Sequence, residues 1–180
     1  KNIYEKILEV KPDHFLALGN LGIIFSQSKK YNEAIEIFNK TLKINPKYAE
    51  GYNNLGNVYF ELSEFDKSLD CYKTAVKLDP NFSDAFNNLG NVYQKKEDLN
   101  KAIESYEAAI SLNSGLNKDK PYYNLGNIFR ESGSLEKSID YYKSYCISTG
   151  KEHYCALRLI DRKHLVDTFS DVKGTKKSKK

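Results

Sequence analysis

The sequence predicts an all-α protein, a helix-turn-helix repeat solenoid, and three observations lead to this fold class. The first is the tripeptide Asn-Leu-Gly, which recurs with spacings of 34, 34 and 36 residues and begins at Asn20, Asn54, Asn88 and Asn124. The second is a set of other residue types that keep the same step, namely Pro12, Pro46 and Pro80, and Phe38, Tyr72, Tyr106 and Tyr142. The third is that each period contains two amphipathic segments. A fixed period of this length indicates a stacked array, in which each unit buries its apolar face against its neighbours.

The helices are predicted in pairs, after a single helix over residues 1–10. The pairs cover residues 15–28 and 32–44, 49–62 and 66–78, 83–96 and 100–112, and 120–132 and 136–148. In the second pair, Leu55 and Tyr59 share one face of the first helix at helical spacing. Asp66, a residue type that favours N-caps, opens the second helix. Pro80 marks its end, because proline cannot continue the backbone hydrogen bonds of a helix.

Small residues recur at the same period inside the predicted helices. They are Gly22, Gly56, Gly90 and Gly126 in the first helices, and Ala34, Ser68, Ala102 and Ser138 in the second. Glycine costs about 1 kcal/mol in a helix interior, so four glycines in register need a structural reason. We expect paired helices to approach closely at these positions. The space between the helices is then filled by the aromatic residues Phe25, Tyr59, Tyr93 and Phe129.

The ends of the chain depart from the regular repeat. Residues 114–118 replace the proline turn and predict a longer loop, and residues 152–169 predict one more helix that caps the last repeat. The predicted organisation is a half repeat (1–14), repeats 15–48, 49–82, 83–116 and 119–148, a capping helix (151–170) and a disordered basic tail (171–180). Because the chain opens inside a second helix, we expect it to be a piece of a longer protein, truncated at its amino end.

The basic character of the chain is confined to its tail. The formal net charge is +4, but residues 173–180 carry five lysines and no acid, which leaves about −1 for residues 1–172. A solvated tail is the expectation, and nucleic-acid binding is unlikely on this charge. No stretch approaches 18 uninterrupted apolar residues, so no membrane span is expected. The three cysteines lack zinc-site spacing and are expected to be free thiols in a cytoplasmic protein.

Signals of catalysis are poor. His14, His153 and His164 are scattered along the chain, and His153 with Cys155 alone makes no metal site, since zinc needs three or four converging ligands. The sequence has no phosphate-binding glycine loop and no nucleophile elbow. We therefore expect no enzymatic activity, no cofactor, no metal and no small-molecule substrate.

The sequence resembles the tetratricopeptide repeat family over residues 1–148. The resemblance is carried by the Asn-Leu-Gly-x-x-Tyr/Phe run of each first helix, and by the Ala-x3-Phe/Tyr pattern and closing proline of the second. It implies antiparallel helix pairs that wind into a right-handed superhelix, with a concave groove lined by the first helices. Tyr145 stands where the family has a small residue, and Ser114 stands where it has proline. Both departures suggest a distorted last repeat.

Asparagine dominates the predicted groove face. Asn20, Asn54, Asn88 and Asn124 form one column, Asn57, Asn91 and Asn127 lie one turn further on, and Asn53 and Asn87 lie beside them. A carboxamide both donates and accepts, so it can hold the N–H and C=O of an extended peptide whatever its side chains. Helices about 10 Å apart would meet an extended chain about every third residue. This resembles the asparagine ladders of some peptide-binding family members. The alternative is that the asparagines bind only neighbouring helices or water.

Charged residues flank the asparagines and would set the sequence preference. The face is apolar in the first repeat, acidic at Glu50 and Asp84, and basic at Lys95, Lys120 and Arg130. A mixed-charge extended segment fits this order. The carboxylate clamp of chaperone-binding family members needs a lysine where this chain has Gly19, so binding of a chaperone tail is not expected.

Three functions from different classes follow from these patterns. The first is a protein-interaction module that binds an extended segment of a partner. The second is the recognition arm of a larger enzyme, such as a glycosyltransferase, whose catalytic domain lies outside this chain. The third is a scaffold that self-associates or contacts nucleic acid through its lysine tail. The first is preferred, and its partner and oligomeric state are not identified by the sequence.

Overall fold

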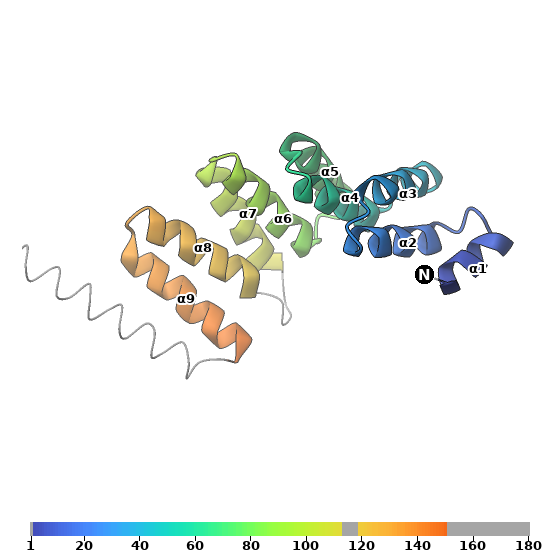
Figure 1. The fold of residues 1–180 in the computed structure, drawn as a ribbon. Helices are drawn as coiled ribbons and strands as arrows, with labels where there is room; N and C mark the ends of the chain where they lie inside the picture. Colours follow the sequence, from blue (N-terminus) through green and yellow to red (C-terminus); the bar gives the residue numbers. More distant parts are fainter. Residues whose placement is uncertain (1, 113–118, 151–180) are drawn as a thin grey trace, which may run out of the picture. The chain divides into compact units, whose positions relative to one another are not determined.

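The computed structural model describes residues 2–112 and 119–150, and these residues form only helices and turns (Figure 1). The helices are α1 (Asn2–Val10), α2 (Phe15–Gln27), α3 (Tyr31–Ile44), α4 (Ala49–Glu61), α5 (Phe65–Leu78), α6 (Ser83–Lys95), α7 (Leu99–Leu112), α8 (Asp119–Glu131) and α9 (Leu135–Thr149). The predicted all-α repeat solenoid is confirmed, and every predicted helix pair within the described residues is present.

The chain divides into two compact units, residues 1–112 and residues 113–180. In the first unit α2 packs on α3, α4 on α5 and α6 on α7, and short turns join the two helices of each pair (Figure 1). The second helix of each pair also contacts the first helix of the next, and α2, α4 and α6 contact one another in succession. In the second unit α8 packs on α9.

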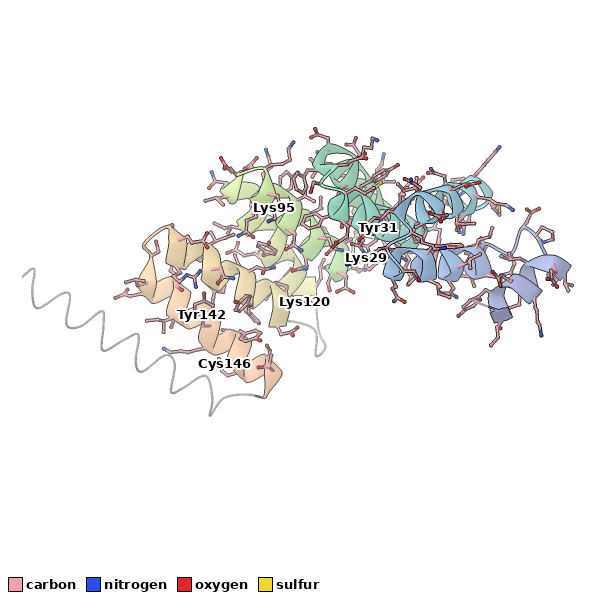
Figure 2. All side chains as sticks on the ribbon, viewed as in Figure 1. Lys29, Tyr31, Lys95, Lys120, Tyr142 and Cys146 are labelled. Carbon is pink, nitrogen blue, oxygen red and sulfur yellow. The ribbon has the colours of Figure 1, made fainter. Side chains whose placement is uncertain are left out.

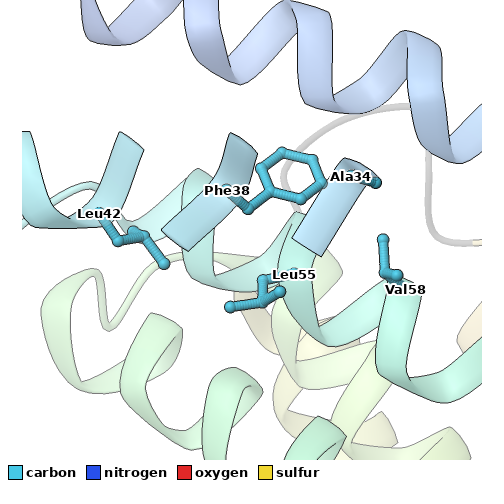
Figure 3. Close-up of a cluster of buried hydrophobic side chains, with 5 residues drawn as sticks. All are labelled: Ala34, Phe38, Leu42, Leu55 and Val58. Carbon is cyan, nitrogen blue, oxygen red and sulfur yellow. The ribbon is translucent and has the colours of Figure 1, made fainter. Parts of the chain in front are cut away.

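The apolar core repeats along the first unit. Phe38 and Leu42 of α3 pack with Leu55 and Val58 of α4, and Phe38 and Val58 are almost completely buried (Figure 3). One period later, Tyr72 of α5 packs with Leu89 and Val92 of α6. Within the first unit, α3 and α5 therefore bury their apolar faces against the first helix that follows, as the period of the sequence predicts.

The four glycines in register face aromatic rings of their paired helices. A Cβ atom added to Gly22, Gly56, Gly90 or Gly126 would lie 2.8, 2.6, 2.5 or 2.6 Å from the nearest ring carbon of Phe38, Tyr72, Tyr106 or Tyr142. The Oγ atom of Ser68 donates a hydrogen bond of 2.9 Å to the carbonyl oxygen of Gly56, and Ser138 does the same to Gly126 at 2.8 Å. The predicted close approach is confirmed. The aromatic ring of the paired helix occupies the space that a Cβ atom would take, and this is why each position is glycine.

The start of each second helix differs from the prediction by one residue. Tyr31, Phe65, Leu99 and Leu135 are the first residues of α3, α5, α7 and α9. Asp66 is therefore inside its helix, and Glu64 at the N-cap position makes no side-chain capping bond. Just before each second helix the backbone turns through a left-handed residue, with φ of 58° at Lys29, 59° at Ser63, 61° at Glu97 and 79° at Gly133. This turn ends the first helix without a proline.

Several expectations concern residues that the structure does not describe. The loop at 114–118, the capping helix (151–170) and the basic tail (171–180) lie outside the described residues. The departure at Tyr145 lies inside them, and its ring packs 5.4 Å from that of Tyr123.

The cysteines of the described residues do not all behave as expected. Cys71 is a free thiol, and burial raises its pKa to about 11. The expectation of free thiols is wrong for Cys146, which is disulfide-bonded. Of the helices in the described ranges, none combines the length and the apolar character needed to cross a bilayer.

Candidate functional site

Three asparagines of the predicted ladder lie on neighbouring helices of the first unit. Asn20 of α2, Asn54 of α4 and Asn88 of α6 occupy equivalent positions, and all three side chains are half-buried. We call the surface around these three carboxamides the asparagine face. Asn124 holds the equivalent position on α8 of the second unit and is also half-buried.

The asparagines one turn further on hold the tyrosines of the core. The hydroxyl group of Tyr72 donates to Oδ1 of Asn57 at 2.7 Å. In the same way Tyr106 donates to Asn91 at 2.8 Å, and Tyr142 donates to Asn127 at 2.6 Å. Each of these bonds joins a first helix to its paired second helix. The carbonyl groups of this row therefore satisfy buried phenols, which leaves less hydrogen-bonding capacity for a ligand than the sequence predicts.

The asparagines beside the ladder are buried. Asn53 is 7% exposed and Asn87 is 8% exposed, so the prediction that they line an open face is wrong. Nδ2 of Asn88 donates to Oδ1 of Asn53 at 2.9 Å and lies 3.1 Å from Oδ1 of Asn57. These bonds tie α6 to α4, the preceding first helix. Within the described residues, Asn20 and Asn54 make no such side-chain bond.

The sequence itself indicates that Asn57, Asn91 and Asn127 contact the tyrosines, although the repeat period alone does not. Three of the four repeats pair a tyrosine on the second helix with an asparagine on the first. The other repeat has Phe38 in place of the tyrosine and Ile23 in place of the asparagine. The hydroxyl group and its acceptor are therefore lost together, which indicates that they contact each other.

The charged residues predicted to flank the ladder lie on exposed helix surfaces. Glu50 of α4 and Asp84 of α6 lie in the first turns of neighbouring helices, and Lys95 lies at the end of α6 (Figure 2). Lys120 and Arg130 belong to α8 of the second unit, where Arg130 lies 3.4 Å from Glu131. The first unit thus contains Glu50, Asp84 and Lys95 of the predicted charge order, with Asp84 and Lys95 at opposite ends of α6.

Tyr48 precedes α4 and fixes the carboxylate of Glu50. Its hydroxyl group donates to Oε2 of Glu50 at 3.0 Å. Burial, together with the hydrogen bond to Glu50 and the negative charge of its carboxylate, raises the pKa of Tyr48 to about 12. The phenol is therefore protonated at neutral pH and acts as a donor.

An alkaline titration should detect Tyr48 and Tyr72 as tyrosines that ionise late. Desolvation by burial raises the pKa of Tyr72 as well. Because each phenol has a higher pKa in the folded chain than in the unfolded chain, it contributes to the free energy of unfolding. This contribution is complete below the unfolded pKa of about 10 and is lost as the pH rises through about 12. Phenolate absorbance of the folded protein should show a late fraction, which Tyr48→Phe reduces. Titration of all 14 tyrosines together, as in the urea-unfolded chain, would contradict this.

The described residues contain no cluster of three or more histidine, cysteine, aspartate or glutamate side chains that could hold a metal ion. Asp98 of the third pair is a capping residue: its Oδ1 accepts from the backbone N–H of Lys101 at 3.3 Å. Lys101 also donates from its side chain, and these bonds lower the pKa of the Asp98 carboxyl group.

Family models match most of the helical array. The model described as TPR repeat matches residues 22–63 and 56–97. Models described as Tetratricopeptide repeat match residues 83–116 and 119–146. No curated protein sequence matches the chain.

Solved structures of repeat proteins are similar in fold. The crystal structure of MamA has a TM-score of 0.72 and 28% identity, and the alignment covers 84% of this chain and 87% of MamA. PilF of Pseudomonas aeruginosa has a TM-score of 0.77 and 21% identity, with coverage of 93% and 77%. YrrB has a TM-score of 0.68 and 20% identity, with coverage of 88% and 89%. The chain therefore belongs to the tetratricopeptide repeat family and is a protein–protein interaction module.

Proposed function

We propose that the chain binds an extended peptide segment of a partner protein, and that the carboxamides of the ladder hold the peptide backbone. The observation that carries this proposal is the row of half-buried asparagines at equivalent positions on α2, α4 and α6. A half-buried carboxamide is partly desolvated already, so a ligand that completes its hydrogen bonds displaces little ordered water.

The spacing of the helices suits an extended ligand. Packed helices lie about 8–10 Å apart, and an extended chain advances about 3.3 Å per residue. Successive carboxamides of the first unit would therefore meet every third residue of a bound strand. Asparagine also costs about 0.6 kcal/mol more than alanine inside a helix, so its repetition needs a compensating interaction.

The fold is compatible with peptide binding. YrrB, which shares the fold, is described as a repeat protein with an unusual peptide-binding site. That site belongs to YrrB, and we carry over only the idea that such an array can bind a peptide. The proposed module has no catalytic role of its own in this scheme, and acts by holding its partner.

Selection from a displayed library of random peptides tests this function. The full chain should enrich peptides, and the triple variant Asn20→Ala, Asn54→Ala, Asn88→Ala of the first unit should bind the best of them at least tenfold more weakly, since each lost hydrogen bond is worth about 0.5–1.5 kcal/mol. The matched control replaces Asn32, Asn39 and Asn100, which are exposed on second helices, by alanine. Circular dichroism must show that both variants are folded. Equal affinity of both variants, or no enrichment by the wild type, would overturn the proposed function.

A further inference from the structure

The ladder asparagines of the first unit differ in whether their side chains form hydrogen bonds within the protein. Asn88 uses its amide group within the protein, because Nδ2 donates to Oδ1 of Asn53 at 2.9 Å and lies 3.1 Å from Oδ1 of Asn57. Asn54 holds the same position one repeat earlier but makes no side-chain hydrogen bond within the described residues. The repeat period explains the difference. The residues of α2 that correspond to Asn53 and Asn57 are Gly19 and Ile23, and neither offers a side-chain acceptor.

Asn20 is equally unengaged within the described residues. Its carboxamide and that of Asn54 each keep two N–H donors and one carbonyl acceptor, which is what an extended peptide backbone can satisfy. Asn88 keeps chiefly its carbonyl oxygen. Two adjacent helices, α2 and α4, thus present complete carboxamides, and the third presents one that is already committed to the fold.

The surroundings of these two carboxamides are apolar on α2 and acidic on the next helices. Leu16 of α2 is 46% exposed, and Ile23 is half-buried. Gly19 lies against Tyr48, since a Cβ on Gly19 would be 3.3 Å from Cε1 of that ring. The hydroxyl group of Tyr48 in turn holds the carboxylate of Glu50, which lies one turn before Asn54 on the same helix.

Two acidic residues, Glu50 and Asp84, are exposed on this surface. Glu50 and Asp84 form no ion pair within the described residues, whereas Glu64, Asp66 and Asp98 of the same unit each pair with a lysine. They occupy equivalent positions on α4 and α6, two helices in contact with each other, so a cationic side chain that lies between the two helix starts would face both carboxylates. The charge that would complement this pair is positive.

We propose that Asn20 and Asn54 hold the backbone of the bound segment, that Asn88 is a structural tie between α4 and α6, and that the segment is cationic. The bound segment places an apolar side chain against Leu16 and Ile23, and a lysine or arginine between Glu50 and Asp84. The occupant is a segment of a partner protein. This inference rests on the proposed function and adds the chemistry of the ligand and the location of the contacts.

The inference is tested by the sequences of the peptides that the wild-type chain selects from the displayed library, and by the affinity of the best peptide for variants of the chain. Peptides selected by the full wild-type chain should be enriched in lysine and arginine next to apolar residues. The best peptide should bind the variant Glu50→Gln, Asp84→Asn about tenfold more weakly, because each exposed ion pair contributes about 0.2–1 kcal/mol. Its affinity for the wild type should also fall as salt rises from about 0.1 M to about 1 M. The matched control is Glu36→Gln, Asp70→Asn, which removes an exposed pair with the same 34-residue spacing from second helices.

The asparagines are tested with the same peptide. Asn20→Ala with Asn54→Ala should weaken binding about tenfold, while Asn88→Ala, studied below its unfolding temperature, should weaken it less than threefold. Selected peptides without basic residues, or unchanged affinity of the Glu50, Asp84 variant, would overturn the cationic assignment and leave peptide binding intact. If deletion of residues 173–180 strengthens binding tenfold, the lysine tail of the chain itself occupies the face, and the assignment to a partner is overturned.

Discussion

Replacement of Gly90 by alanine should lower the free energy of unfolding by about 3 kcal/mol, although alanine is the better helix former. The added Cβ atom would lie 2.5 Å from Cε1 of Tyr106 and 2.6 Å from Cδ1. The Tyr106 side chain is fully buried, so its ring has no space into which it can turn. The overlap must be relieved by a shift of α7 relative to α6.

The estimate combines three contributions. Helix propensity favours alanine over glycine by about 1 kcal/mol. Overpacking of a filled core costs about 1–3 kcal/mol. A displaced Tyr106 also loses the hydrogen bond of its hydroxyl group to Asn91 (2.8 Å), and a buried polar group without its partner costs about 1–3 kcal/mol. The two losses exceed the gain.

Urea denaturation followed by circular dichroism measures this change. Gly19→Ala is the matched control within the same unit, because its Cβ would lie 3.3 Å from Tyr48, a half-buried ring that can yield by a few tenths of an ångström. The control should remain within about 0.5 kcal/mol of the wild type. Equal stability of both variants would show that the glycine column does not exist to admit the rings.

The sequence was sufficient to predict the fold because the constraint repeats. Gly56 and Gly90 recur at the same place, each with a small residue and an aromatic residue at a fixed distance, so chance agreement is excluded by the number of columns. The exact start of α5 was not predictable in this way. Asp66 is a good capping residue, yet the left-handed turn at Ser63 begins the helix at Phe65, because the connection and the packing of Phe65 against Phe60 set the boundary.

The candidate site was less predictable than the fold. A helical wheel places Asn53, Asn54 and Asn57 on one surface, but it does not say which of them a neighbouring helix covers. In the structure α6 covers Asn53, and the hydroxyl group of Tyr72 reaches Asn57. These contacts depend on how three helices pack, and the pattern of one helix contains no such information.

Two asparagines at equivalent positions should respond to alanine in opposite directions. Asn88→Ala should lower the free energy of unfolding by about 1–2 kcal/mol, because it removes the donor to Asn53, whose side chain is only 7% exposed. Asn54→Ala removes no hydrogen bond within the described residues, so the better helix propensity of alanine should raise the free energy of unfolding by about 0.6 kcal/mol.

The two variants can be compared directly, because Asn54 and Asn88 are both half-buried asparagines at the same position of a first helix. The difference that the structure links to the side-chain bond is on the preceding first helix: Asn53 and Asn57 for Asn88, and Gly19 and Ile23 for Asn54. Thermal unfolding of both variants measures the difference, and the double variant Asn53→Ala, Asn88→Ala should recover part of the loss, since no buried carbonyl group is then left without a donor. If both single variants destabilise the chain equally, the ladder is a uniform structural feature, and no pair of asparagines remains set apart to hold a ligand.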